Sequence, residues 1–139
     1  MESIAVIFWS GTGNTANMAQ EVVAGTGGQA KLINVTDTNA DEAAAYDKLA
    51  LGCPSMGDEV LEEDEMEPFF TALEGKISGK KVVLFGSYDW GDGQWMRDWA
   101  ERTKKAGAIL AADPLIVNLS PDADGKAKCR ELGKALADA

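Results

Sequence analysis

Residues 4–15 read IAVIFWSGTGNT, an almost unbroken apolar run that passes directly into a loop rich in glycine and hydroxyl groups. An apolar run without alternation is typical of a strand covered on both faces, as in a parallel sheet. Apolar residues then recur at helical spacing, namely Ala16, Met18, Ala19, Val22 and Val23. A strand, a glycine-rich turn and a helix in this order predict the opening unit of an α/β fold.

The rest of the chain repeats this alternation. Further apolar runs predict strands at residues 30–35, 48–52 and 81–86, and a fifth strand within 108–119, where Asp113-Pro114 could interrupt it. A weak helical turn is expected at residues 41–45. Longer helices are indicated by Met66, Phe69, Phe70 and Leu73, by Trp95, Met96, Trp99, Ala100 and Thr103, and by Cys129, Leu132 and Leu136. We therefore predict one α/β domain over residues 1–139, with a five-stranded parallel sheet between helices.

The amino-acid composition excludes several classes of function. The 139 residues carry 13 basic and 23 acidic side chains, a net charge of −10, which disfavours nucleic acid and anionic membranes and favours basic protein surfaces. No histidine is present, which excludes histidine-dependent triads and histidine-ligated zinc. Cys53 and Cys129 form no CxxC pair, which excludes a thioredoxin-like site and a four-cysteine iron–sulfur cluster. We expect no metal.

Nothing in the sequence indicates a membrane or secreted protein. The first residues, MESIAVIFWS, begin with an acid and lack the basic start and long apolar run of a signal peptide. No stretch approaches the roughly 20 apolar residues of a membrane span. Two thiols without a framework of pairs suit a reducing compartment, so we expect a cytoplasmic protein.

The loop Ser10-Gly11-Thr12-Gly13-Asn14-Thr15 has two glycines, three hydroxyls and one amide, but no charge. Backbone N–H groups, hydroxyls and a helix N-terminus together form an anion cradle. The loop lacks the lysine of a Walker A motif and the third glycine of GxGxxG, so a single phosphate monoester fits better than a triphosphate or dinucleotide. A tight turn with a capped helix is the alternative.

Two further loops leave the carboxyl ends of predicted strands, where ligands bind in open α/β sheets. Residues 54–59, PSMGDE, combine the soft apolar Met56 with the permissive Gly57. Residues 87–93, SYDWGDG, carry two aromatic side chains, which suggests stacking on a planar ligand. An ordinary turn, and a Trp90 packed under its loop, are the alternatives. Trp9, Trp95 and Trp99 are expected in the core or on helix faces.

In these three loops, and over essentially its whole length, the chain resembles the short-chain bacterial flavodoxins. The resemblance implies the flavodoxin-like doubly wound sheet with strand order 2-1-3-4-5 and FMN as the cofactor. It also implies a low-potential one-electron carrier that is not an enzyme and has no catalytic residues. Its non-covalently bound FMN would alternate between the neutral semiquinone and the anionic hydroquinone.

The resemblance further implies a set of cofactor-binding residues. These are Ser10, Gly11, Thr12, Gly13, Asn14, Thr15, Ser55, Met56, Gly57, Asp58, Glu59, Ser87, Tyr88, Asp89, Trp90 and Gly91. The first loop would hold the 5′-phosphate, and Met56 and Trp90 would cover the two faces of the ring. Glu59 would contact the pyrimidine edge, and the Gly57 carbonyl would turn toward N5. Asp89 stands where many relatives have glycine, and adds a negative charge near the ring.

Acidic residues are dense around the second loop. Seven acids fall within residues 58–67, at Asp58, Glu59, Glu62, Glu63, Asp64, Glu65 and Glu67. We hypothesise that they form a rim that disfavours the anionic reduced flavin and attracts basic redox proteins, which a monomer would bind transiently. A solvated helix N-terminus is the simpler alternative.

Three other functions are compatible with an α/β fold of this kind. A phosphorelay receiver domain is rejected, because its acidic and lysine positions hold Ser10, Cys53 and Asp113-Pro114 here. An FMN-dependent NAD(P)H or quinone reductase remains an alternative, as does a flavin-binding storage or sensor module.

Overall fold

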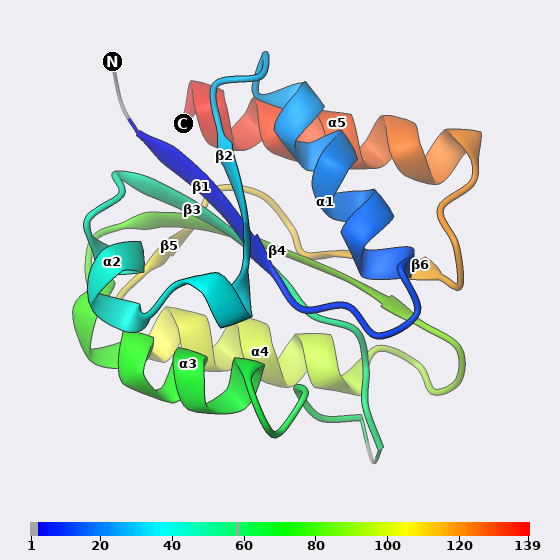
Figure 1. Cartoon of the computed structure of the whole chain (residues 1–139), viewed down its shortest axis with the longest axis horizontal. Coiled ribbons are helices and arrows are strands. Elements are labelled where there is room, and N and C mark those ends of the chain that lie inside the picture. Colours follow the sequence, from blue (N-terminus) through cyan, green and yellow to red (C-terminus); the bar gives the residue numbers. More distant parts are fainter. Residues whose placement is uncertain (1–2, 58) are drawn as a thin grey trace.

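The computed structural model describes residues 3–57 and 59–139. Strands and helices alternate along the chain (Figure 1). Their bounds are β1 Ile4–Phe8, α1 Asn14–Gly25, β2 Lys31–Asn34, α2 Ala40–Ala44, β3 Lys48–Gly52, α3 Met66–Leu73, β4 Lys81–Tyr88, α4 Gln94–Lys105, β5 Ile109–Leu110, β6 Leu115–Asn118 and α5 Ala123–Asp138. Two short 3-10 helices, η1 Val35–Asp37 and η2 Glu74–Lys76, complete the list.

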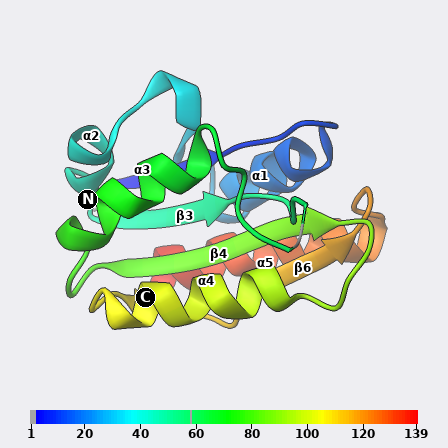
Figure 2. The ribbon, with the colours of Figure 1, turned by 90° about the horizontal axis from the view of Figure 1, so that it is seen from below.

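The strands form one parallel sheet in the order β2-β1-β3-β4-β5, which confirms the predicted order. The predicted fifth strand is present as two segments, β5 and β6, which both pair with β4 and are separated at the Asp113-Pro114 interruption that the sequence suggested. Four residues, 111–114, lie opposite only two residues of β4, and Pro114 has no N–H for a ladder. The arrowheads of β3, β4 and β6 lie on one side of the molecule (Figure 2).

Helices cover both faces of the sheet, with α1 and α5 on one side and α3 and α4 on the other (Figure 1). Ile4 and Val6 belong to the cluster beneath α1 and α5, whereas Ala5 and Ile7 belong to the opposite cluster. Both faces of β1 are therefore buried, which explains its unbroken apolar run.

Helices α1 and α5 approach each other through glycine. A Cβ at Gly133 would lie 2.1 Å from the carbonyl oxygen of Val22, and a Cβ at Gly25 would lie 2.0 Å from that of Arg130. Neither position has room for a methyl group, because the obstructing atoms are backbone. The glycines therefore set the spacing of the two helices.

We predict that Gly133→Ala lowers the free energy of unfolding by about 1–3 kcal/mol, since the added methyl group meets rigid backbone. Urea denaturation measures this change. Gly125→Ala in the same helix is the matched control, because its Cβ would meet only ordinary contacts at 3.4 Å or more. That control is expected to be neutral or stabilising by up to about 1 kcal/mol. Equal losses in both variants would contradict the close-packing argument.

Candidate functional site

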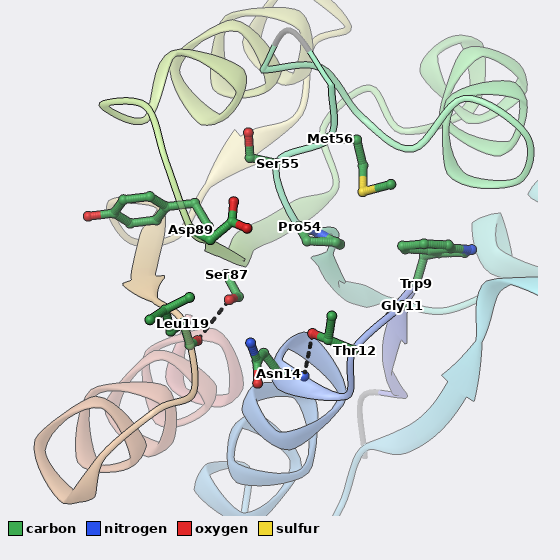
Figure 3. Close-up of a pocket in the computed structure, with 11 residues that line it drawn as sticks. Trp9, Gly11, Thr12, Asn14, Pro54, Ser55, Met56, Ser87, Asp89 and Leu119 are labelled. Carbon is green, nitrogen blue, oxygen red and sulfur yellow. Dashed lines mark hydrogen bonds between the residues drawn. The ribbon is translucent and has the colours of Figure 1, made fainter.

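A cavity of about 240 Å³ lies at the carboxyl edge of the sheet, and is called here the carboxyl-edge hollow (Figure 3). The residues that line it are Trp9, Gly11, Thr12, Asn14, Pro54, Ser55, Met56, Ser87, Tyr88, Asp89 and Leu119. Eight of them were predicted site residues. All three predicted loops therefore meet at one hollow, joined by a fourth segment that contributes Leu119.

The first loop is shaped by its own hydrogen bonds. Gly13 has φ 97° and immediately precedes α1, a conformation that favours glycine. The Ser10 hydroxyl accepts N–H bonds from Gly13 (3.1 Å) and Ala16 (3.2 Å), so it organises the loop from within. Among the described residues, the N–H groups of Gly11, Thr12 and Thr15 have no acceptor. These donors and the α1 N-terminus suit an anion.

Thr15 and Ser87 tie separate segments of the site together. The buried Thr15 hydroxyl accepts an N–H bond from Ser87 at 3.4 Å, so Thr15 does not line the hollow. The Ser87 hydroxyl donates to the carbonyl of Leu119 at 2.8 Å. Leu119 was missed in the sequence, although its place after the last strand brings it to the same edge. Its φ of 58° is unusual for a branched residue, and its side chain is 51% exposed beside the hollow.

The second loop is a tight turn closed by two backbone bonds. Met56 and Val60 each donate an N–H to the other's carbonyl at 2.9 Å. Gly57 is exposed with φ 50°, which agrees with the conformational freedom predicted for it. The half-buried Met56 lines the hollow, and Figure 3 shows its side chain above Trp9. Asp58, also predicted, lies outside the described residues.

Other predicted residues of this site stand away from the hollow. Glu59 does not line it and instead accepts N–H bonds at the start of α4. In the third loop, Asp89 lines the hollow, whereas Trp90 and Gly91 do not; the Trp90 side chain is 57% exposed. The cofactor contacts proposed for Glu59, Trp90 and Gly91 stay predictions.

Trp9 was expected in the core or on a helix face, and the structure places it partly against the core and partly at the hollow. It is only partly buried and lines the hollow, although it also packs against the core. Its N–H donates to the carbonyl of Gly52 at 3.0 Å, one residue past the end of β1. A position directly after a buried parallel strand was the signal that could have placed it at the site.

The acidic residues within 59–67 do not form one uniform, solvent-exposed rim. The Glu62 carboxylate is buried and accepts N–H bonds from Asp64, Glu65 and Met66 at 2.7–3.0 Å. Glu63, Asp64 and Glu65 have exposed side chains. The run thus combines a structural cap at the start of α3 with a solvent-facing patch.

Glu67 is paired with a cation from another helix. Arg102 of α4 donates to both Glu67 carboxylate oxygens, at 2.7 and 2.9 Å, and to Glu74 at 2.9 Å. Its guanidinium lies 5.0 Å from the centre of the Phe70 ring. Hydrogen bonds from Arg102 lower the pKa of Glu67, and those carboxylates raise the pKa of Arg102. This network joins α3 to α4.

Cys53 lies at the end of β3 and is fully buried. Burial raises the pKa of its thiol to about 12, so the nucleophilic thiolate is scarce. Among residues 3–57 and 59–139, no group of acids and cysteines is arranged to hold a metal ion. Within that same part of the chain, no helix is long and apolar enough to cross a membrane.

Comparisons with known proteins point to one family. The family model described as flavodoxin matches residues 6–133. A flavodoxin of Clostridium beijerinckii is 51% identical over 136 residues, covering 96% of this chain and 98% of that protein. A flavodoxin of Megasphaera elsdenii is 47% identical, covering 98% and 99%. The solution structure of the two-electron reduced Megasphaera elsdenii flavodoxin superposes with a TM-score of 0.89 at 46% identity, covering 98% of this chain and 99% of that one.

The Glu67–Arg102 pair predicts a pH effect. The pKa of Glu67 is lower in the folded chain than in the unfolded chain. The ionised Glu67 therefore stabilises the fold fully above the unfolded pKa of about 4.3, and this stabilisation is lost as the pH falls through the folded pKa. Glu67→Gln should lower the free energy of unfolding at neutral pH by up to about 1 kcal/mol, a small value because the pair is partly solvated. The deficit should shrink below about pH 4.

Urea denaturation across this pH range measures the effect. Glu63→Gln is the control, because Glu63 is exposed and has no cationic partner among the described residues. A deficit of the same size at every pH would contradict the pairing argument.

Proposed function

Because this chain belongs to the flavodoxin family, we propose that it is a low-potential one-electron carrier built on non-covalently bound FMN, working between the neutral semiquinone and the anionic hydroquinone. Flavodoxins are FMN-binding electron carriers rather than enzymes, so the reductase alternative is set aside. We propose that residues 1–139 act as a single FMN-binding domain. The arrangement of the carboxyl-edge hollow, polar at one end and apolar at the other, carries the proposal.

The polar end fits a phosphate. Unpartnered N–H groups of Gly11, Thr12 and Thr15 lie where the helix dipole of α1 also favours a negative charge. The side chain of Asn14 lines the same end (Figure 3). The loop has no cationic side chain, so binding rests on backbone donors. Ser10 and Gly13 hold the loop in the shape that presents them.

The other end fits a flat ring. Trp9, Met56 and Tyr88 give it apolar walls, and Leu119 adds an apolar side chain to the lining of the hollow beside Asn14 (Figure 3). The ring centres of Tyr88 and Trp95 lie 5.8 Å apart, which fixes the aromatic wall to α4. We propose that the exposed Trp90, on the loop next to this wall, covers one ring face. A cavity of about 240 Å³ is smaller than most ligand sites. Part of the ring would therefore stay at the surface, where an electron can pass to a partner.

FMN supplies the one-electron chemistry, and the residues around it control where protons and charge are stable. The apolar walls exclude water from the ring. Gly57, with φ 50°, sits in a turn where the absence of a side chain permits its peptide to reorient. Its carbonyl is proposed to accept a hydrogen bond from a proton held at N5.

Negative charge near the hollow opposes further negative charge on the ring. Asp89 lines the hollow, and Glu59 and Glu62 carry carboxylates whose partners are N–H groups rather than cations. At an effective dielectric constant of about 20, a pair of charges roughly 8 Å apart interacts by about 2 kcal/mol before screening by salt. Several such charges would lower the reduction potential for the addition of the second electron to the flavin.

The exposed acids suit basic partners. Glu63, Asp64, Glu65 and Asp89 are exposed and carry no ion pair among the described residues, and Asp89 lines the hollow. We propose that the protein is a cytoplasmic monomer that meets basic redox proteins transiently, with rates that fall as salt rises.

An anaerobic dithionite titration of the purified protein, followed by visible absorbance, tests the proposal. We expect bound flavin and a long-wavelength band from the one-electron-reduced form at high yield. Direct conversion to the fully reduced form would contradict one-electron transfer. Failure of the colourless protein to take up added FMN would contradict the site itself.

The role of Gly57 predicts a specific loss. Gly57→Thr should decrease the maximum yield of the one-electron-reduced form, because a β-branched residue resists positive φ and peptide reorientation. Gly75→Thr is the control, since Gly75 is exposed, lies in η2 and has open space at its Cβ position. An unchanged yield in Gly57→Thr would contradict the proposed carbonyl contact.

A further inference from the structure

The Trp95 side chain of α4 joins the ends of β3 and β4. Its indole N–H donates to the carbonyl of Cys53 at 3.1 Å, and its ring centre lies 5.8 Å from that of Tyr88, the last residue of β4. Trp95 is 1% exposed, so both contacts are made away from water. Breaking the buried hydrogen bond would leave a donor and an acceptor unsatisfied. One side chain therefore holds the residue before the second loop and an aromatic residue of the third.

The bond from Trp95 takes the place of a ladder bond between β3 and β4. The N–H of Cys53 donates to the carbonyl of Phe85 at 3.1 Å, and the N–H of Ser55 donates to the carbonyl of Ser87 at 3.0 Å. The even spacing of a parallel ladder would bring the Ser87 N–H to the Cys53 carbonyl between these two bonds. That N–H donates instead to a side chain of α1, and the Cys53 carbonyl accepts from Trp95. The ladder is thus completed at this point by the side chains of two helices.

The residues around this bond leave room for it. A Cβ at Gly86 would lie 2.1 Å from the Cys53 carbonyl oxygen and 3.2 Å from a carbon of the Trp95 ring. Glycine at position 86 therefore provides the space in which the carbonyl and the indole meet. Pro54, which follows Cys53, has no N–H and cannot add a ladder bond of its own. The indole N–H therefore holds the chain where it leaves β3 for the second loop.

The carboxyl-edge hollow lies directly beyond these contacts. Residues 54–56, which follow Cys53, all line the hollow, and so does Tyr88. Trp95 is buried and does not line the hollow, so it would act on a ligand only through these neighbours. A Cys53 carbonyl released by Trp95 would be buried without a donor unless it rotated toward the ladder. Such a rotation would move residues 54–56 relative to Tyr88.

We infer that Trp95 is a positioning residue, which sets the spacing of the second and third loops at the hollow by holding the Cys53 carbonyl and the Tyr88 ring together. The inference rests on the proposed FMN site for its functional consequence, the fit of the flat ring between the two loops. The hydrogen bond itself is formed by protein atoms alone, so it can be tested without FMN.

Trp95→Phe and Trp99→Phe form a matched pair of variants. Both tryptophans lie in α4 and are 1% exposed, and each packs against another aromatic ring, Tyr88 for Trp95 and Phe70 for Trp99. The Trp99 indole N–H, however, has no acceptor in the described part of the chain. Trp99→Phe therefore removes the same atoms without breaking a hydrogen bond. A third variant carries benzothienylalanine at position 95, which keeps the shape of the indole and replaces only its N–H by sulfur.

The carbonyl carbon-13 signal of Cys53 in the FMN-free full-length chain tests the hydrogen bond. The signal should move in Trp95→Phe and in the benzothienylalanine variant, because the carbonyl loses its donor in both. It should keep its position in Trp99→Phe. Amide signals of α1 and α5 report whether each variant is folded, and the benzothienylalanine variant carries the test if Trp95→Phe does not fold. An unmoved Cys53 signal in that variant would overturn the inference.

FMN affinity tests the positioning role. Trp95→Phe and the benzothienylalanine variant should each raise the dissociation constant about tenfold, whereas Trp99→Phe should change it by less than about twofold. The free energy of unfolding is expected to fall in both phenylalanine variants, because each loses buried ring area, so affinity rather than stability separates the two positions.

Two results would overturn the positioning role. Equal losses of FMN affinity in Trp95→Phe and Trp99→Phe would show a general loosening of α4, and an unchanged affinity in the benzothienylalanine variant would show that the N–H is not needed. Absence of FMN binding in the parent protein would refute the proposed function, while the Cys53 carbonyl signal would still decide whether the hydrogen bond is present.

Discussion

The burial of β1 on both faces is the constraint on which the site depends. Ile4, Ala5, Val6 and Ile7 are all at most 3% exposed, and β1 pairs with β2 on one side and β3 on the other. A strand in that position can move only with the whole sheet. The loop that follows it therefore leaves from a fixed point, and α1 begins at a fixed distance from the ends of β3 and β4. The donors for an anion are positioned by the core rather than by the loop alone.

The spacing of apolar residues along the sequence predicted most of this architecture, because individual helices and strands are determined largely by residues close together in the chain. The spacing of Met66, Phe69, Phe70 and Leu73 predicted α3, and all four are buried. The three ligand loops were predicted because parallel strands bring their carboxyl ends to one edge. Asp113-Pro114 marked the place where the last strand could be interrupted, but only the pairing with β4 shows that it divides into β5 and β6.

The errors and omissions at the site concern long-range contacts. Trp9 is as apolar as the strand before it, and only the end of the ladder at Phe8 distinguishes its position. The acidic run read as a uniform patch, yet Arg102 neutralises Glu67 from 35 residues away. Glu59 likewise finds its partners in α4. Such pairings become visible only when the helices are docked, because charge patterning along one segment carries no information about a partner on another.

The break between β5 and β6 has a consequence for how the chain can vary in length. It lies on an edge strand, where residues 111–114 stand opposite only two residues of β4. The hydrogen-bond ladder therefore already accommodates two extra residues at this point. Both flanking strands remain paired to β4 on either side of it. Extra residues at 111–114 would extend outward from the sheet edge without shifting α4 or the loops at the hollow. Residues 111–114 are therefore a suitable insertion point, because a segment or domain inserted there would be attached to the electron carrier away from its cofactor site.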